Sequence, residues 1–338
     1  MSKYRVGIAA MVHDHVWGEL NHWSKLPNAE LVAAGDVNEE LREKVKSEYG
    51  VTSLYKSWQE MVEKEELDIV QAAAENSVGA EIVEACAAKG IHVITEKPMA
   101  ARLEQANRML AAAEKAGTRL LVNWPTAWQP PIYWMLEMIH AGDIGEPFYL
   151  KYRAAHNGPK EIGCSEYFWK WLYDQELNGA GAFMDYCCYS AAMNSYILGL
   201  PRRCIGFRAK LVKDYDVPDD NAAILMHYPH GMGVAEASWT QKTGTWSPNP
   251  IAYGSEGSVG VLKGKIVLHQ EGKEPREIDP SPMPVGYTNG PEHFIHCIET
   301  GEPIRGTCDP EISRDAQAIL EAGLLSADRG QPVSPEPY

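Results

Sequence analysis

Ile94-Thr95-Glu96-Lys97-Pro98-Met99 is the stretch from which the fold can be worked out. It follows Lys89-Gly90-Ile91-His92-Val93, a pattern typical of a helix end, a glycine stop and a short buried strand. A lysine at the carboxyl end of such a strand lies where open α/β sheets bind their ligands. Because the proline fixes its own φ and restricts Lys97, the triplet can direct an amine at a ligand, with an acid beside it. A polar turn before the next helix is the alternative.

Strands and helices alternate on both sides of this stretch. Apolar runs at 4–10, 30–36, 67–73 and 119–123 predict strands, whereas 15–26, 41–49, 57–65, 78–89 and 103–116 predict helices. This alternation is typical of a parallel, doubly wound sheet. We therefore expect an α/β protein in which residues 1–123 form a Rossmann dinucleotide-binding domain.

The pattern changes after Asn123. Alternating or β-rich runs predict further strands, separated by turns such as Pro229-His230-Gly231, at 148–155, 204–212, 222–228, 232–240, 251–253, 259–262 and 266–270. These runs indicate an open, mainly antiparallel sheet. We expect residues 124–338 to form an α+β domain for substrate binding and oligomerisation. One sheet face needs cover, which favours a homodimer or homotetramer through that face.

Charge and composition limit the class of partner. The 338 residues carry a formal charge of -15, which argues against nucleic acid, and no run approaches the ~20 apolar residues of a membrane span. The start, Met1 to Arg5, shows no export signal. Seven scattered cysteines without a Cys-x-x-Cys pair fit a reduced, cytoplasmic protein. The sequence shows no compact His/Asp/Glu cluster, so we expect no metal.

An acid ends the second predicted strand. Asp36 lies ~20 residues beyond the first turn, where a ribose-binding carboxylate stands in dinucleotide sites. A carboxylate there accepts ribose hydroxyls and repels a 2′-phosphate. No arginine occurs within Asp36-Val37-Asn38-Glu39, which favours NAD over NADP. A helix cap is the alternative role for Asp36.

The first turn departs from the usual glycine loop. Ala10-Met11-Val12-His13-Asp14-His15 stands where Gly-x-Gly-x-x-Gly is expected, and all three glycines are replaced. Side chains there crowd a pyrophosphate, so either the loop takes another course or the cofactor is displaced. We still expect Ala10, Met11, Val12 and His13 to border the cofactor. His13 and His15 can reach phosphates or substrate, or act as polar groups of the turn.

Taken together, these features resemble the Gfo/Idh/MocA oxidoreductases, the relatives of glucose–fructose oxidoreductase and inositol dehydrogenase. The similarity spans nearly the whole chain. It rests on the strand–helix plan with Asp36, Asp68-Ile69-Val70, Gly90 to Pro98, Gly142-Asp143-Ile144-Gly145-Glu146-Pro147, and Gly179 to Asp185 with Tyr189 beyond.

The resemblance implies a mechanism. An NAD(P) nicotinamide would lie over the strand ends, and a sugar, cyclitol or similar polyol would bind between the domains. Lys97 would hydrogen-bond the reacting hydroxyl. The family stretch Asp-x-Gly-x-His reads Asp185-Tyr186-Cys187-Cys188-Tyr189 here, so a tyrosine replaces the acid–base histidine. Glucose–fructose oxidoreductase is similar in using tyrosine at this place.

Elementary chemistry agrees with this assignment. Asp185 and Tyr189 are four residues apart, so they share one helix face. A free tyrosine has a pKa of ~10. An ammonium such as Lys97 would favour the phenolate, which makes Lys97 and Tyr189 a proton-transfer pair. The alternatives are core packing for Tyr189 and a structural acceptor role for Asp185.

A second loop also departs from the family pattern. Ala74-Glu75-Asn76 stands where the family often has Thr-Pro and then histidine, and we expect it to border the nicotinamide together with Glu96 and Lys97. The expected function is an NAD(P)-dependent dehydrogenase or reductase of a sugar, sugar derivative or cyclitol. One alternative is a glycoside hydrolase or lyase that retains NAD and acts by transient oxidation. The other is a non-catalytic sugar or NAD sensor.

Several aromatic and polar residues are candidates for substrate contact. Aromatic rings pack on the C–H faces of sugars. Besides Lys97, Asp185 and Tyr189, we expect contacts from Trp124, His156, Lys160 and Trp171. The alternatives are core packing for the tryptophans and a solvated loop for His156 and Lys160. The identity of the sugar and of the oxidised carbon does not follow from these residues.

Overall fold

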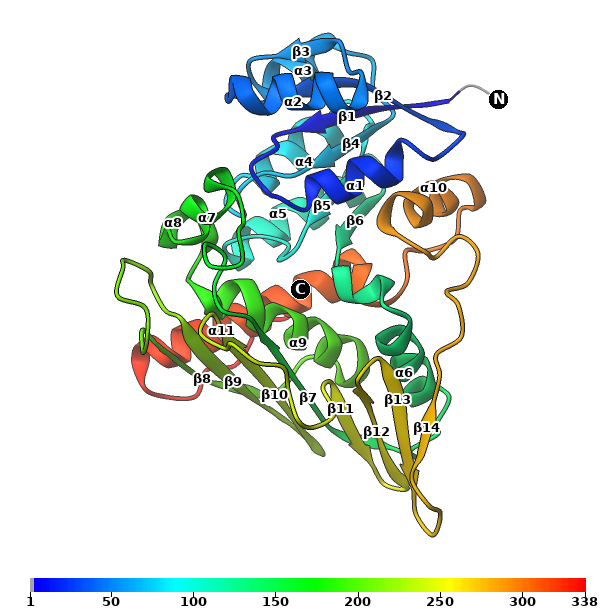
Figure 1. Ribbon diagram of the computed structural model, residues 1–338, viewed down its shortest axis with the longest axis vertical. Coiled ribbons are helices and arrows are strands. Elements are labelled where there is room, and N and C mark those ends of the chain that lie inside the picture. Colours follow the sequence, from blue (N-terminus) through cyan, green and yellow to red (C-terminus); the bar gives the residue numbers. More distant parts are fainter. Residues whose placement is uncertain (1–2) are drawn as a thin grey trace.

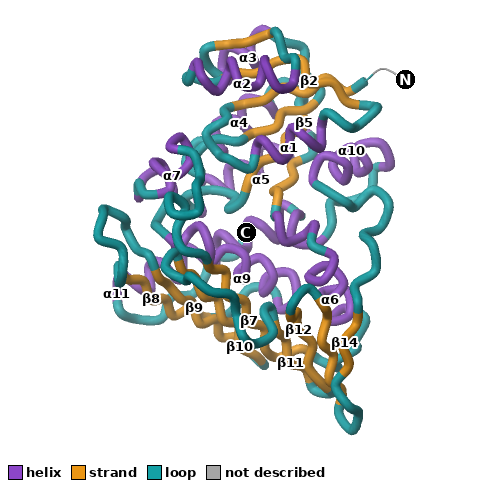
Figure 2. Tube along the Cα trace, in the orientation of Figure 1, coloured by secondary structure: helices purple, strands orange, loops and turns teal. Residues whose placement is uncertain are grey.

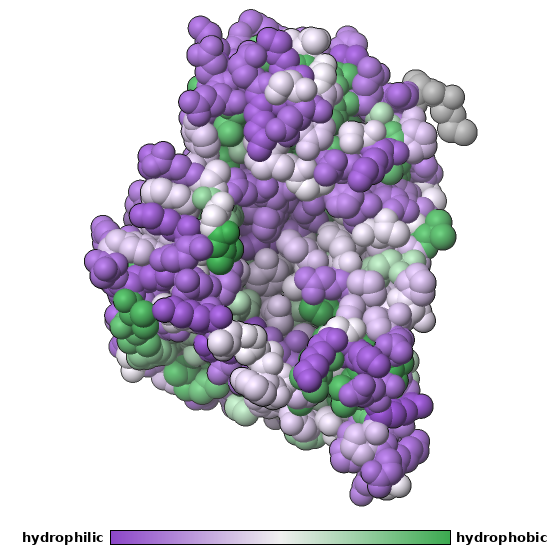
Figure 3. Space-filling model, in the orientation of Figure 1, coloured by the Kyte–Doolittle hydropathy of each residue, from purple (hydrophilic) through white to green (hydrophobic). Residues whose placement is uncertain are grey.

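The computed structural model describes residues 3–338 and divides its strands between two sheets, one above the other in Figure 1. Residues 1 and 2, which begin the stretch in which we expected no export signal, lie outside the described part. Figure 3 shows the surface hollowed between the two sheets, with mainly hydrophilic residues around the hollow. No helix within residues 3–338 is both long and apolar enough to cross a bilayer.

The first sheet has six parallel strands in the order β3-β2-β1-β4-β5-β6. The order reverses between β1 and β4, which is the switch point where such sheets bind ligands. The Rossmann prediction is confirmed. The elements are β1 (Tyr4–Ala9), α1 (Val16–Trp23), β2 (Ala29–Gly35), α2 (Glu39–Tyr49), β3 (Ser53–Tyr55), α3 (Trp58–Lys64), β4 (Ile69–Ala72), α4 (Gly79–Ala87), β5 (His92–Glu96), α5 (Leu103–Ala116) and β6 (Leu120–Asn123).

Local signals explain where several of these helices begin and end. Ser57 accepts a hydrogen bond from the Glu60 amide and caps α3. Gly50 and Gly117 follow α2 and α5 with φ of 73° and 66°, a conformation that glycine adopts readily. The strands β4, β5 and β6 are almost wholly buried, because helices cover both sheet faces.

The second sheet has eight strands in the order β14-β13-β12-β11-β7-β10-β9-β8. Only β7 and β10 pair in parallel, so the prediction of a mainly antiparallel sheet is confirmed. The elements are η1 (Pro125–Trp128), α6 (Pro130–His140), β7 (Pro147–Ala155), α7 (Glu166–Leu172), α8 (Gln175–Asn178), α9 (Ala182–Leu198), β8 (Arg203–Ala209), β9 (Asn221–Tyr228), β10 (Gly231–Ser238), β11 (Ile251–Gly254), β12 (Gly257–Leu262), β13 (Lys265–Gln270), β14 (Arg276–Ile278), α10 (Gly290–Thr300), η2 (Gly306–Cys308) and α11 (Pro310–Arg329).

Helices cover only one face of the second sheet (Figure 2). The central helix α9 packs against β7, β9 and β10, and α11 packs against both α9 and α5. The chain end therefore returns to the first sheet, and α10 lies beside α1 in Figure 1. The buried Arg314 of α11 donates to Asn107 Oδ1 at 2.7 Å, which ties the last helix to α5.

Candidate active site

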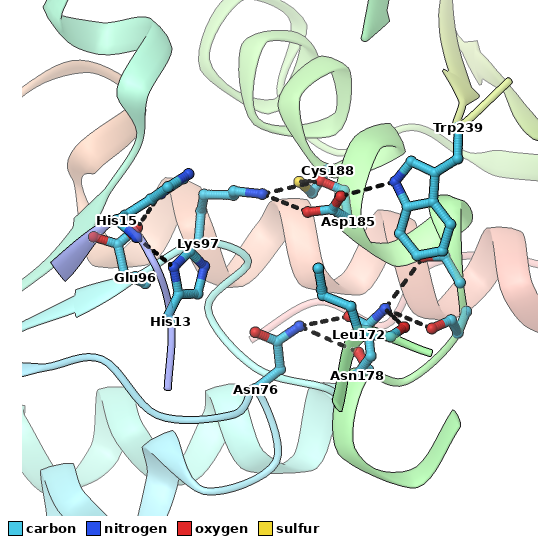
Figure 4. Close-up of polar contacts among 12 residues, drawn as sticks. His13, His15, Asn76, Glu96, Lys97, Leu172, Asn178, Asp185, Cys188 and Trp239 are labelled. Carbon is cyan, nitrogen blue, oxygen red and sulfur yellow. Dashed lines mark hydrogen bonds and ion pairs between the residues drawn. The ribbon is translucent and has the colours of Figure 1, made fainter. Parts of the chain in front are cut away.

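A buried ion pair joins the carboxyl end of β5 to helix α9. Lys97 Nζ lies 2.6 Å from Asp185 Oδ1 and also donates to the Asp185 carbonyl oxygen at 3.3 Å. Both side chains are almost fully buried, at 2% and 5% exposure. Figure 4 shows the lysine reaching across to the aspartate on α9. The interpretation of the triplet as a mere polar turn is therefore not supported.

The pair is held in its ionised form. Burial alone would lower the pKa of Lys97, but Asp185, with smaller contributions from nearby groups, raises it well above the usual value. Burial likewise disfavours the Asp185 carboxylate, yet the Lys97 ammonium holds the pKa of that carboxyl below its usual value. Lys97 is therefore an ammonium at neutral pH, a hydrogen-bond donor and not a base.

Trp239 fixes the other oxygen of the aspartate. Its indole Nε1 donates to Asp185 Oδ2 at 3.1 Å, and its side chain is fully buried. Trp239 directly follows β10, whose carboxyl end lies beside that of β7. Our sequence analysis missed this residue because the contact depends on the pairing of distant strands.

Tyr189 lies beside the ion pair, one helical turn beyond Asp185. The Lys97 ammonium lies 4.9 Å from the centre of its ring, and Trp124 packs edge-on against it. Burial raises the pKa of Tyr189 strongly, and the opposing effect of Lys97 is smaller. Lys97 does favour the phenolate, as expected, but desolvation outweighs this attraction, so the pKa of Tyr189 is raised overall. Tyr189 is a neutral phenol here.

His156 reaches the same place from the end of β7. Its Nδ1 accepts a hydrogen bond from the Gly158 amide at 2.8 Å, and its ring meets Tyr186 edge-on. Burial is the largest cause lowering its pKa, so the ring is neutral. Because Nδ1 accepts from an amide, the proton of the neutral ring lies on Nε2. The Tyr186 ring in turn lies 5.8 Å from the Lys97 ammonium, so one ring separates His156 from the ion pair.

Three of the expected substrate residues have other partners in the structure. Trp124 is buried and donates to Ser313 Oγ at 3.0 Å, so it supports Tyr189 from behind. Trp171 is also buried and donates to the Val12 carbonyl. Lys160 is exposed, with its ammonium 5.3 Å from the Trp169 ring. These contacts do not support a substrate role for Trp124, Trp171 or Lys160.

Asp36 anchors the loop that replaces the glycine motif. Its Oδ2 accepts from the Met11 amide at 2.6 Å, and its Oδ1 accepts from the amide and side chain of Asn38. A carboxylate has about four acceptor positions, so roughly one stays available for a ribose hydroxyl. Burial raises the pKa of Asp36, and these hydrogen bonds oppose the rise. The carboxylate therefore anchors the loop and keeps one acceptor position unused among the described residues.

The loop itself offers few free amides to a pyrophosphate. The amides of His13 and Val16 donate to the carbonyls of Ala73 and His13, and that of His15 donates to His13 Nδ1. Ala10 adopts a left-handed φ of 58°. Ala10, Met11, Val12 and His13 are all at most 8% exposed. The structure thus fits a dinucleotide at its ribose and nicotinamide ends, whereas the pyrophosphate lacks the usual cradle of backbone amides.

An arginine lies closer to Asp36 than we expected. Arg42, one turn into α2, donates to the Asp36 carbonyl oxygen at 2.5 Å. No arginine occurs within residues 36–39, but a helix brings residue 42 back over the strand end, so the sequence argument for NAD overlooked a nearby guanidinium. A guanidinium here weakens the case against a 2′-phosphate.

The three residues of the loop after β4 have different surroundings. Asn76 is buried and donates to Asn178 Oδ1 at 2.8 Å, so its side chain ties the loop after β4 to α8. Ala74 is also buried. Burial raises the pKa of Glu75, and Asp36 adds to the rise, so the two acids lie near each other. Of the three residues, Glu75 best fits a cofactor contact.

Two histidines and an acid converge at the edge of the site. The ligand atoms of His13, His15 and Glu96 all lie within 4.8 Å of one another (Figure 4). Our expectation that the chain holds no compact cluster of this kind is wrong. The cluster is not evident from sequence spacing, because only the fold brings residue 96 beside the first loop.

Comparison with known proteins agrees with this architecture. The model for the oxidoreductase family with an NAD-binding Rossmann fold matches residues 6–124, and the model for the GFO/IDH/MocA C-terminal domain matches residues 134–260. D-apiose dehydrogenase from Paraburkholderia graminis is 33% identical, over 93% of this chain and 85% of that protein. The chain therefore belongs to the Gfo/Idh/MocA oxidoreductase family.

Two further relatives extend the comparison. Myo-inositol 2-dehydrogenase from Thermotoga maritima is 24% identical, over 73% of this chain and 72% of that protein. The crystal structure of aldose–aldose oxidoreductase from Caulobacter crescentus superposes with a TM-score of 0.80 at 20% identity, covering 98% and 99% of the two chains. The prediction of an NAD-binding, hydride-transferring oxidoreductase fits these relatives.

Proposed function

We propose that this protein is an NAD-dependent oxidoreductase that transfers hydride between the nicotinamide and a carbon of a sugar or cyclitol. The observation that carries the proposal is the Lys97–Asp185 ion pair at the end of β5, with Tyr189 and His156 beside it. Relatives named for apiose, inositol and xylose oxidation support the substrate class. The absorbance of reduced nicotinamide, followed with a panel of sugars and cyclitols, tests it.

Residues on both sides of the switch point would hold the cofactor. Asp36 and Glu75 would border its ribose end, and Glu96 and Lys97 would border its nicotinamide end. When bound, the nicotinamide supplies or accepts the hydride. The chain's own groups orient the substrate oxygen and exchange its proton.

The protonation states favour one direction at neutral pH. The Lys97 ammonium, the neutral Tyr189 hydroxyl and the His156 Nε2–H are all donors, as their pKa shifts and hydrogen bonds require. Donors stabilise the oxygen of a carbonyl substrate and the charge that develops on it. Oxidation of a hydroxyl needs one of these groups to give up its proton first. We propose that oxidation therefore speeds up as the pH rises.

Replacing His156 with alanine is expected to lower kcat/KM by about 10- to 100-fold, because one oriented donor to the substrate oxygen is lost. Lys160→Ala serves as the matched control, since that lysine lies nearby on the exposed loop and packs on Trp169. Steady-state kinetics on both variants measure the difference. Equal losses in the two variants, or none in His156→Ala, would contradict a role for His156.

A second candidate function is transient oxidation with a retained cofactor. The segment 165–178 of the second domain reaches onto the dinucleotide edge. Ser165 donates through its amide and its hydroxyl to the Asp14 carboxylate, at 2.6 and 2.5 Å. Tyr167 bonds Glu40 at the start of α2. Because these contacts run from the first loop to α2, they cross the edge where the adenosine half of a dinucleotide lies.

Loosening this segment is expected to free the nucleotide. Ser165→Ala removes both the hydroxyl bond to Asp14 and the cap of α7, and we expect NADH to dissociate about 5- to 10-fold faster. Lys170→Ala is the control, because this α7 side chain is 61% exposed and pairs only with Glu166 among the described residues. Stopped-flow NADH fluorescence gives both rates. Identical rates would show that the segment does not retain the cofactor.

We also propose a homo-oligomeric assembly and a cytoplasmic location. Exposed apolar side chains lie on the uncovered face of the second sheet, among them Ile205, Phe207, Leu225, Met232 and Tyr253. They support a homodimer or homotetramer through this face, which light scattering of the purified protein tests.

Seven free cysteines, six of them buried, support a cytoplasmic location, which cell fractionation would test.

A further inference from the structure

We propose that His13, His15 and Glu96 form a binding site for a divalent transition-metal ion. The two histidines come from the loop between β1 and α1, and the glutamate ends β5. His15 Nδ1 lies 2.9 Å from Glu96 Oε2, and the three ligand atoms lie within 4.8 Å of one another. Ligands about 2.0–2.2 Å from an ion lie roughly 3–3.5 Å apart, so small side-chain movements suffice.

The carboxylate ligand is oriented by a chain of partners. Glu96 Oε1 accepts from Asn123 Nδ2 at 2.8 Å, and Asn123 Oδ1 accepts from Trp128 Nε1 at 2.8 Å. These contacts leave Oε2 directed at the histidines. Metal ligands are commonly held in this way by a second layer of hydrogen bonds.

The His13 ring has few competing contacts. His13 is 1% exposed. Within residues 3–338, the hydrogen bond of the His13 ring runs to Nδ1, from the His15 amide at a long 3.3 Å. Breaking this long hydrogen bond costs little free energy.

The cluster holds a buried carboxylate. Glu96 is 4% exposed, and among the described residues no lysine or arginine lies within ion-pair distance of it. Buried carboxylates are costly unless a cation or strong donors compensate them. The nearest strong cation, Lys97, is already held by Asp185 at 2.6 Å, so it is directed away from this cluster.

The surroundings are rigid on one side and open on the other. The Phe168 ring lies 4.4 Å from that of His13, and Ser165 fixes Asp14 between the two histidines. The His15 side chain is 35% exposed, which gives an ion a route to the site. Two imidazoles and one carboxylate, with at least one position open, suit Zn²⁺, Fe²⁺, Mn²⁺ or Co²⁺.

Metal titration without nucleotide tests the site independently of the proposed reaction. Tag-free protein treated with chelator is titrated with Zn²⁺ by calorimetry and with Co²⁺ by visible absorption. We expect one ion per chain, with His15→Ala and Glu96→Gln each weakening affinity at least about 100-fold. The control His230→Ala, a histidine in an exposed turn, should bind as the native protein does.

Thermal unfolding of each variant shows whether its fold is intact, and Glu96→Gln preserves the side-chain size if His15→Ala is unstable. Absence of stoichiometric binding to the native protein would overturn the site. So would unchanged Zn²⁺ affinity in a folded Glu96→Gln variant.

Discussion

Replacing Lys97 with methionine is expected to lower kcat/KM by about 10³- to 10⁴-fold, the usual range for loss of a positioned proton donor together with its charge. The ammonium is the one group at the end of β5 that combines full burial, a fixed aspartate partner and a pKa held well above its usual value. Steady-state kinetics in both directions measure the loss. Calorimetry with NAD should show binding within a few-fold of native.

The control must separate chemistry from folding. Lys97→Met leaves the Asp185 carboxylate buried without its cation, so the double variant Lys97→Met/Asp185→Asn removes both charges together. We expect the double variant to regain most of the lost stability and none of the activity. Near-normal turnover in either folded variant would contradict the role of Lys97.

Replacing Asp185 with alanine is expected to lower the free energy of unfolding by about 3–5 kcal/mol, because the Lys97 charge is then buried alone. Chemical denaturation measures the change. Glu166→Ala, which breaks the exposed pair with Lys170, serves as the comparison and should cost at most about 1 kcal/mol. A small effect of Asp185→Ala would show that the buried pair does not contribute to stability.

The pH dependence of the same variants has a definite sign. In the native protein the pKa of Asp185 is lowered, so its stabilising effect is lost as pH falls through that value. The pKa of Lys97 is raised, so its stabilising effect is lost as pH rises through that value. In Asp185→Ala, the largest contribution that raises the pKa of Lys97 is removed, so we expect burial to lower that pKa. The variant should therefore become more stable as pH rises from neutral toward the ordinary pKa of lysine, unlike the native protein.

Sequence patterns within single elements were enough to predict several parts of the fold and the site. The alternation of strands and helices led to the Rossmann domain, and the four-residue spacing of Asp185 and Tyr189 placed them on one face of α9. Lys97 was found from its place at a strand end. In each case the information lies within one element or at its boundary.

The remaining features depend on contacts between distant segments. Trp239 reaches Asp185, Asn76 reaches Asn178, and Glu96 reaches His15 only because particular strands and helices lie side by side. Burial was equally hard to foresee, since Trp124 carries the same ring whether it faces a sugar or a core. The upward shift in the pKa of Tyr189 could not be foreseen for the same reason, because it is caused by burial.

The central claim is that bound nicotinamide exchanges hydride with a sugar-type substrate at Lys97. Single-turnover mixing tests it most directly, with NAD-loaded protein in excess over each of a set of aldopentoses, aldohexoses, cyclitols and glycosides at alkaline pH. The absorbance band of reduced nicotinamide should appear with at least one of them, and Lys97→Met should abolish it. The account is contradicted if no member of the set reduces the bound nicotinamide, or if the Lys97→Met variant does so at the native rate.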